Sequence, residues 1–181
     1  MKKYIIILSI VIGVIALIVI ASPNQESKLL KTYGINNLST QKMVESLEKQ
    51  TINPEALIAS ISATTLTLTT PNQVYTYQVP NTLFYLSVAP YINNTHPCGT
   101  HNLTTCRGEL ANETFEVRVV TQSGLIILHE NITTNDNGFM GIWLPRNIEG
   151  TIEVNYQGML SSYEISTSID SDTCLTTMRL T

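Results

Sequence analysis

The sequence predicts an α+β protein, with a small N-terminal helix-plus-hairpin domain followed by an antiparallel β-sandwich. Thr, Ser, Asn and Ile are frequent among the 181 residues, which favours strands and turns over long helices. Apolar residues at helical spacing are confined to the first third of the chain. Short alternating segments separated by turn residues fill the remainder, as is typical of a small sandwich.

The N-terminus carries a targeting signal. Lys2 and Lys3 precede an apolar run at residues 5–21 that is interrupted only by Ser9 and Gly13. Such a run is about 25 Å long as a helix, between the lengths of a signal-peptide core and a membrane span. Residues 1–21 are therefore expected to be either a cleaved signal peptide or a retained membrane anchor. In both cases the rest of the chain lies outside the cytoplasm.

The charge of the chain excludes some partners. The formal net charge is −4, and two of the ten basic residues are Lys2 and Lys3, so the exported part is more acidic still. No cluster of Lys or Arg occurs downstream of the apolar run. Nucleic acid and anionic lipid headgroups are poor candidate partners, because both bind through basic patches.

Residues 22–37 are expected to form a linker with a short helix, followed by an α+β domain at 38–90. Ser39 or Thr40 can cap a helix that extends through Lys49. The apolar face of this helix consists of Met43, Val44 and Leu47. Asn53 and Pro54 predict a second helix start, with the asparagine as cap and the proline in the first turn.

From residue 65 onward the apolar period changes from helical to alternating. Residues 65–69 and 74–79 alternate on either side of Pro71 and Asn72, which predicts a β-hairpin. Residues 83–89 form a third predicted strand. These strands complete the N-terminal domain.

Residues 91–181 are expected to form the β-sandwich that carries the functional site. A loop rich in turn formers follows Pro90. Six strands are then predicted, at residues 114–120, 125–129, 139–144, 151–156, 162–167 and 175–180. Trp143 is the expected anchor of the sandwich core.

The three cysteines, Cys98, Cys106 and Cys174, allow two interpretations. Cysteines outside the cytoplasm usually pair, which would give one structural disulfide and one spare thiol. The odd count instead fits a metal site, because an exposed spare thiol in an oxidising compartment is a liability. From their spacing alone the two interpretations are level. The absence of a CxxC motif argues against thioredoxin-type exchange.

The segment around the first two cysteines favours the metal site. His96, Cys98, His101 and Cys106 fall within eleven residues of one loop. Thiolates select Cu(I) and Zn, and imidazole suits either metal. A structural zinc finger would need closer ligand pairs at both ends, so that interpretation is weaker. Cys174 can join the site only if the last strand begins beside this loop.

Longer motifs in the same region resemble a known family. They are THPC at residues 95–98, HxLTTCxGEL at 101–110, NGFxGxWLPR at 137–146 and TCLTT at 173–177. YLSVAPY at 85–91 fits the same pattern. Together they closely resemble the CueP family of copper-binding envelope proteins, from about residue 30 to the C-terminus.

The resemblance implies a bacterial protein of the periplasm or of the outer face of the cytoplasmic membrane. Its implied role is to take up copper, reduce Cu(II) to Cu(I) and support copper resistance. It also implies a homodimer formed through the N-terminal domain, and a copper/zinc superoxide dismutase as a recipient of the copper. The family's redox and metal-binding cysteines fall on Cys98, Cys106 and Cys174, with histidine ligands at His96 and His101.

Thiol chemistry agrees with this role. Two thiols can reduce Cu(II) and end as a disulfide, while the third cysteine and a histidine retain the softer Cu(I). An odd number of cysteines is then a requirement, although the sequence does not say which pair is oxidised. Zinc, which accepts the same donors, is the surrogate metal.

Two rival functions remain open at this stage. The first is a structural or adhesive surface module, stapled by a disulfide and free of metal. The second is a thiol oxidoreductase that acts on proteins. Among other polar residues, His129 is expected at the protein surface, and Glu109 is expected either to orient a ligand or to lie on the surface.

Overall fold

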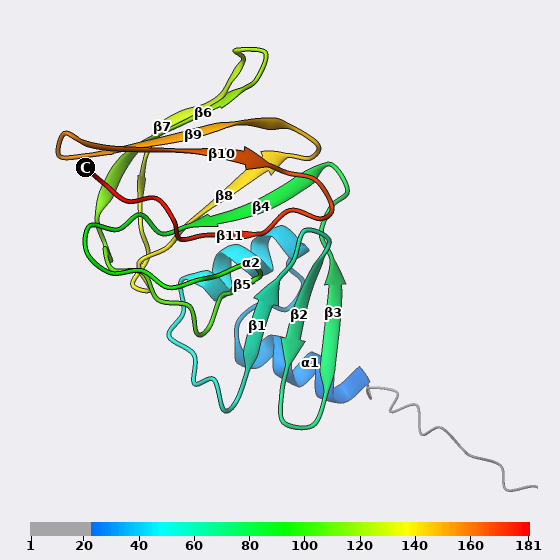
Figure 1. Cartoon of the computed structure of the whole chain (residues 1–181). Helices are drawn as coiled ribbons and strands as arrows, with labels where there is room; N and C mark the ends of the chain where they lie inside the picture. Colours follow the sequence, from blue (N-terminus) through cyan, green and yellow to red (C-terminus); the bar gives the residue numbers. More distant parts are fainter. Residues whose placement is uncertain (1–22) are drawn as a thin grey trace, which may run out of the picture.

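The computed structural model describes residues 23–181, so the predicted signal peptide or anchor lies outside the described residues. The α+β class is confirmed (Figure 1). Two helices come first, α1 (Pro23–Thr32) and α2 (Thr40–Glu48). The strands are β1 (Ile58–Ile61), β2 (Thr65–Thr69), β3 (Val74–Gln78), β4 (Leu83–Val88), β5 (His101–Asn102), β6 (Thr114–Thr121), β7 (Ile126–Thr133), β8 (Met140–Pro145), β9 (Glu149–Tyr156), β10 (Met159–Ser166) and β11 (Cys174–Leu175). Within residues 23–181, neither helix has the length and apolar character needed to cross a membrane.

The strands form three sheets. Their orders are β3-β2-β1-β5, β10-β9-β6-β7 and β11-β4-β8. Figure 1 shows the three-stranded sheet in the middle of the molecule, between the second four-stranded sheet and the N-terminal helices and strands. The middle sheet and the sheet β10-β9-β6-β7 form the sandwich, and their inner faces contribute alternating apolar side chains to one core.

The N-terminal part forms around helix α2. Ser39 caps the helix, and its side chain accepts a hydrogen bond from the Lys42 amide at 3.4 Å. Met43, Val44 and Leu47 are buried, so the predicted apolar face is confirmed. It packs against side chains of β1 and β2 in a second core. The predicted hairpin is also confirmed, with Thr65 opposite Gln78 and Thr69 opposite Val74.

The predicted second helix start at Asn53 is wrong. The cap geometry does form, because the Asn53 side chain accepts the Glu55 amide at 3.0 Å and its carbonyl accepts the Leu57 amide at 3.1 Å. The chain completes only this turn before it enters β1. Ile58–Ile61 pair with β2 on one side and with β5 on the other, and these long-range pairings override the local helix signal.

Strand β4 serves both cores. Phe84, Leu86 and Val88 lie in the sandwich core, while Tyr85 on the opposite face lies in the N-terminal core. This double burial explains why the strand is apolar in sequence without alternation. The predicted boundary at residue 90 assigns β4 to the N-terminal domain, but its hydrogen-bonded neighbours β8 and β11 both come from the C-terminal part. The prediction that Trp143 anchors the sandwich core is wrong. This residue is half-buried and packs against the N-terminal core, where its ring centroid lies 4.8 Å from that of Tyr85.

The predicted last strand at residues 175–180 is wrong in extent. Only Cys174 and Leu175 form a strand, parallel to β4. Beyond them the chain follows the loop after β4, where the Tyr91 carbonyl accepts the Leu180 amide at 2.8 Å. This pairing is irregular because its partner is a loop rather than a strand. Cys174 is the first residue of β11, which is an edge strand of the middle sheet.

Candidate metal centre

The start of β11 is tied to the cysteine-containing loop by backbone hydrogen bonds. The Gly99 carbonyl accepts the amides of Thr173 and Cys174, both at 3.0 Å. The Thr173 hydroxyl in turn accepts the His101 amide at 3.0 Å. These contacts bring Cys174 beside Cys98 although 76 residues separate them in sequence.

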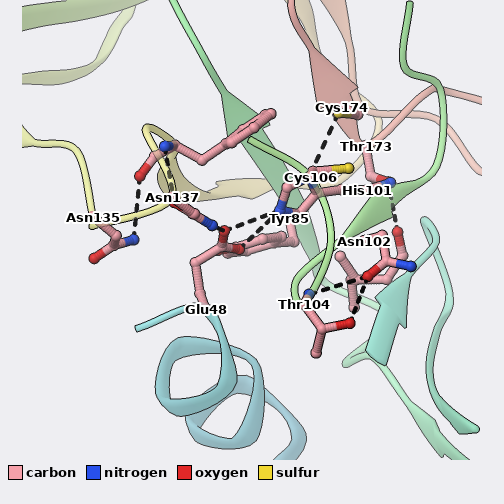
Figure 2. A network of polar contacts seen from close by, with 12 residues as sticks. Glu48, Tyr85, His101, Asn102, Thr104, Cys106, Asn135, Asn137, Thr173 and Cys174 are labelled. Atoms are coloured by element: carbon pink, nitrogen blue, oxygen red, sulfur yellow. Dashed lines mark hydrogen bonds and ion pairs between the residues drawn. The ribbon is translucent and has the colours of Figure 1, made fainter. Parts of the chain in front are cut away.

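Four of the five predicted site residues converge on one point. The donor atoms of Cys98, His101, Cys106 and Cys174 all lie within 4.8 Å of one another, the arrangement expected of a metal-binding cluster. Cys98 and Cys174 form a disulfide with a Cα–Cα distance of 5.6 Å. Cys106 Sγ lies 3.7 Å from Cys98 Sγ. His101 Nδ1 lies 3.5 Å from Cys174 Sγ (Figure 2).

One side of the cluster is buried in the protein, and the other side is accessible to solvent. His101 is fully buried and Cys174 is 5% exposed, whereas Cys98 and Cys106 are partly exposed. The imidazole packs against the buried Phe139 ring at a centroid distance of 4.6 Å. A cavity of about 270 Å³ opens onto the disulfide, and its lining includes Asp172 and Glu164.

A buried carboxylate holds the far side of the imidazole. Glu48, the last residue of α2, is 3% exposed. Its oxygens lie 3.0 and 3.1 Å from His101 Nε2. It also accepts hydrogen bonds from the Tyr85 hydroxyl at 3.0 Å and from Asn137 Nδ2 at 2.6 Å, as Figure 2 shows. Three donors from separate elements therefore meet at one carboxylate.

Electrostatics couple His101 to Cys106. Burial lowers the pKa of His101, but hydrogen bonds with Cys106 and Glu48, and the charges of both, outweigh it and raise the pKa to about 9. Burial raises the pKa of the Cys106 thiol, but hydrogen bonds from His101 and the Asn102 backbone bring the pKa below its usual value. An imidazolium–thiolate pair is favoured as a result. Cys106 is the thiolate partner because Cys174 is held in the disulfide.

His96, the fifth predicted site residue, is not part of the cluster. Its ring lies edge-on to Phe139 at a centroid distance of 6.3 Å. Its carbonyl accepts the Thr176 hydroxyl at 2.7 Å, which fastens the loop to the segment after β11.

Glu109 orients no residue of the cluster. Its carboxylate accepts the backbone amides of Ile92 at 2.6 Å and Asn93 at 2.9 Å, and thereby braces the start of the cysteine-containing loop. His129 lies exposed on β7 and pairs with Glu116 at 2.9 Å, in agreement with the expected surface position.

Two glycines of the motifs allow a close backbone contact beside the site. A Cβ added to Gly108 would lie 2.5 Å from the Gly138 carbonyl, and Gly138 has a φ of +79° that side chains disfavour. The Gly108 amide donates to the Asn137 carbonyl at 2.7 Å. This contact holds Asn137 where its side chain reaches Glu48.

Sequence reasoning did not identify Glu48. A signal was nevertheless present, since Glu48 follows Val44 by four positions and therefore shares the apolar face of α2. A single carboxylate on such a face is unusual, because buried charges need partners. Those partners, Tyr85 and Asn137, lie inside two of the family motifs but could not be connected to Glu48 from sequence.

The donor set suits a soft metal ion. With the Cys98–Cys174 disulfide reduced, three thiolate sulfurs and one imidazole nitrogen favour Cu(I) over hard cations such as Mg²⁺ or Ca²⁺. The buried carboxylate on the remote imidazole nitrogen is the usual outer partner of a metal-binding histidine. The residues present therefore fit copper.

Comparisons with known proteins agree with this chemistry. A family model described as periplasmic copper-binding protein CueP matches residues 42–179. A solved structure titled "Crystal Structure of S.CueP" superimposes with a TM-score of 0.83 at 40% sequence identity, covering 90% of this chain and 99% of that chain. No curated protein sequence matches the chain. The family match spans most of the sequence and both cores, so this chain belongs to the CueP family of periplasmic copper-binding proteins.

Proposed function

We propose that this protein binds Cu(II) and reduces it to Cu(I) with its own cysteine thiols. The observation that carries the proposal is the cluster of three sulfurs and His101 Nδ1 within 4.8 Å, in which two of the sulfurs are joined as a disulfide. When that disulfide is reduced, the cluster can supply two electrons and retain the Cu(I) product at the same place.

The reaction balances with two copper ions per protein chain. In the fully reduced protein, Cys98 and Cys174 each lose one electron to one Cu(II) ion. Their sulfurs join as the disulfide, two thiol protons leave, and two Cu(I) ions result. The observed Cys98–Cys174 bond corresponds to the product state of this step.

Cys106 and His101 are assigned to holding Cu(I). Cys106 is the free cysteine of the three, and its lowered pKa supplies the thiolate that a soft cation requires. His101 Nδ1 supplies a nitrogen from the buried side. Copper would reach them through the cavity at the disulfide, where the carboxylates of Asp172 and Glu164 attract cations.

The experiment adds Cu(II) to the fully reduced protein without any other reductant, in the presence of a Cu(I)-selective chelator. We expect two Cu(I) per chain and the loss of two thiols, with Cys106 still open to alkylation. If no Cu(I) appears, or if all three thiols remain, the proposal is wrong.

Variants separate reduction from retention. Cys106→Ser keeps the Cys98–Cys174 pair and should yield as much Cu(I) in the chelator as the wild type. Without chelator it should lose most of its bound Cu(I) on desalting. The double variant Cys98→Ser, Cys174→Ser should yield less than half the wild-type Cu(I). Equal yields from all three proteins would contradict the assigned roles.

We further propose that the copper is passed on to a copper/zinc superoxide dismutase. We also propose that the protein acts as a homodimer. The N-terminal part supports a dimer, because β3 is a sheet edge and Val74 at its start is 58% exposed. Sedimentation equilibrium should show a dimer that Val74→Glu weakens.

The delivery of copper has its own test. Incubation of the Cu(I)-loaded protein with the metal-free dismutase should restore dismutase activity.

The alternative function, a disulfide-stapled surface module without metal, is favoured only by the Cys98–Cys174 bond itself. It predicts one stable disulfide and no stoichiometric copper. Thiol counting and metal analysis of the same purified sample distinguish the two functions.

A further inference from the structure

The imidazole of His101 can offer copper only one nitrogen. Its Nε2 atom lies 3.0 Å from one Glu48 oxygen and 3.1 Å from the other, in a fully buried contact. A carboxylate accepts hydrogen bonds and donates none, so the proton must lie on Nε2. In the neutral imidazole, Nδ1, which faces the sulfurs, is then the nitrogen with a lone pair available to a metal.

The orientation of Glu48 is itself fixed by two further donors. Tyr85 reaches it from the middle sheet and Asn137 from the loop before β8. Each of the two oxygens therefore accepts one of these hydrogen bonds in addition to its contact with His101. The carboxylate cannot rotate without leaving a buried donor unpaired, which costs about 1–3 kcal/mol.

A glycine on β8 leaves the space that the Tyr85 side chain needs to reach Glu48. Gly141 lies opposite Ser87 in the β4–β8 pairing, and a Cβ added to Gly141 would overlap the Tyr85 hydroxyl oxygen. The Tyr85 ring therefore crosses the space that any other residue at position 141 would fill. The second glycine of the NGFxGxW motif is thus explained by the route of the tyrosine toward Glu48.

We propose that Glu48 is a positioning residue for copper, which holds the Nε2–H of His101 and turns Nδ1 toward the three sulfurs. The inference rests on the proposed function only in naming copper as the ion that Nδ1 meets. It assigns helix α2 a direct part in the site, because the last residue of this helix supplies the carboxylate. The N-terminal part and the sandwich must be packed together for Glu48 to orient His101.

The first test uses the wild-type protein without metal. With ¹⁵N-labelled histidine, NMR spectra recorded over a pH series report which nitrogen keeps the proton when the imidazole becomes neutral. We expect His101 to show a protonated Nε2 and an unprotonated Nδ1. A protonated Nδ1 would overturn the proposal whether or not the protein reduces copper.

The second test compares two substitutions of Glu48. In Glu48→Gln the amide oxygen can accept from His101 and Asn137, while the amide group donates to the Tyr85 hydroxyl. Glu48→Met has similar size but no acceptor. We expect the Gln variant to keep the Nε2–H form and Cu(I) affinity within a few fold of the wild type, and the Met variant to lose at least 10-fold in affinity.

Glu45→Gln on the same helix is the matched control, because the Glu45 carboxylate pairs with Lys42 instead of the site. It should behave as the wild type in both measurements.

Should Glu48→Met fail to fold, the wild-type spectra still decide the question. Wild-type Cu(I) affinity and an unchanged Nε2–H form in a folded Met variant would refute the positioning role. A wild type that yields no Cu(I) but shows the Nε2–H form would refute only the reductase function.

Discussion

Cys106 differs from the other two cysteines in its surroundings. Cys98 and Cys174 are joined, whereas Cys106 is free and faces the imidazole of His101. Hydrogen bonds from His101 and from the Asn102 backbone keep its pKa low in spite of partial burial. A single thiolate beside a buried imidazolium is the arrangement that gives a cysteine high affinity for soft ions and high reactivity toward electrophiles.

We expect the oxidised protein to be alkylated at Cys106 at a pH below that required by an ordinary thiol. The reactive species is the thiolate, and a lowered pKa keeps it populated as the pH falls toward the folded-state pKa. The rate of iodoacetamide labelling, followed against pH by mass spectrometry, measures this. In His101→Gln the profile should move to higher pH, toward that of the unfolded protein. Superimposable profiles for the wild type and His101→Gln would contradict the coupling.

At the scale of single elements, α2 and β4 do most to build the site. Helix α2 ends at Glu48, and β4 presents Tyr85 to the same carboxylate while its other face lies in the sandwich core. Any change that shifts either element relative to the other should disturb the hydrogen bonds around His101. The two elements can be tested separately.

Ser39→Ala should destabilise the protein by about 0.5–1 kcal/mol. The Ser39 side chain caps α2, but its hydrogen bond to the Lys42 amide is long at 3.4 Å, which places the loss at the lower end of the range for caps. Urea unfolding monitored by circular dichroism measures the change. Ser39→Asp, which can still cap, serves as the control and should retain wild-type stability.

Gly141→Ala should destabilise the protein by about 3 kcal/mol. The added methyl group overlaps Tyr85, so the ring must leave its place beside Trp143 and its hydrogen bond to Glu48. Thermal and urea unfolding measure the loss. Gly124→Ala meets no atom within 4 Å but has a φ of +85°, so it isolates the backbone cost of about 1 kcal/mol. In the Tyr85→Ala background, the penalty of Gly141→Ala should largely disappear.

At the scale of the whole molecule, the disulfide joins the loop after β4 to the final segment. Its two cysteines are 76 residues apart, and the enclosed chain contains most of the sandwich. Cross-linking a loop of this length restricts the unfolded chain, which stabilises the folded state by about 4 kcal/mol in the chain-entropy model. The bond that the proposed copper reduction would form is therefore also one that stabilises the fold.

We expect the oxidised protein to be more stable than the fully reduced protein, by up to about 4 kcal/mol. Urea unfolding with and without a thiol reductant measures this difference. The double variant Cys98→Ser, Cys174→Ser lacks the bond and should show the same midpoint under both conditions. If the reductant leaves the wild-type midpoint unchanged, the bond contributes no net stability.

Local patterns were sufficient for much of the fold. The hairpin β2–β3, the apolar face of α2 and the strands of the sandwich follow from periodicity and turn residues, because these signals act over a few residues. Predictions failed where distant partners decide the structure. Residues 58–61 became a strand after a helix-like turn, and the final segment paired with a loop instead of a strand.

The types of donor can be read from the sequence, since thiols and imidazoles in one short loop already indicate a soft metal, and the longer motifs resemble the copper-binding family. Which of these donors meet depends on the tertiary structure. It brought Cys174 to Cys98, left His96 outside the cluster and placed Glu48 behind His101. The reason is physical: side-chain chemistry is a property of each residue, whereas convergence depends on backbone pairing between segments that are far apart in the chain.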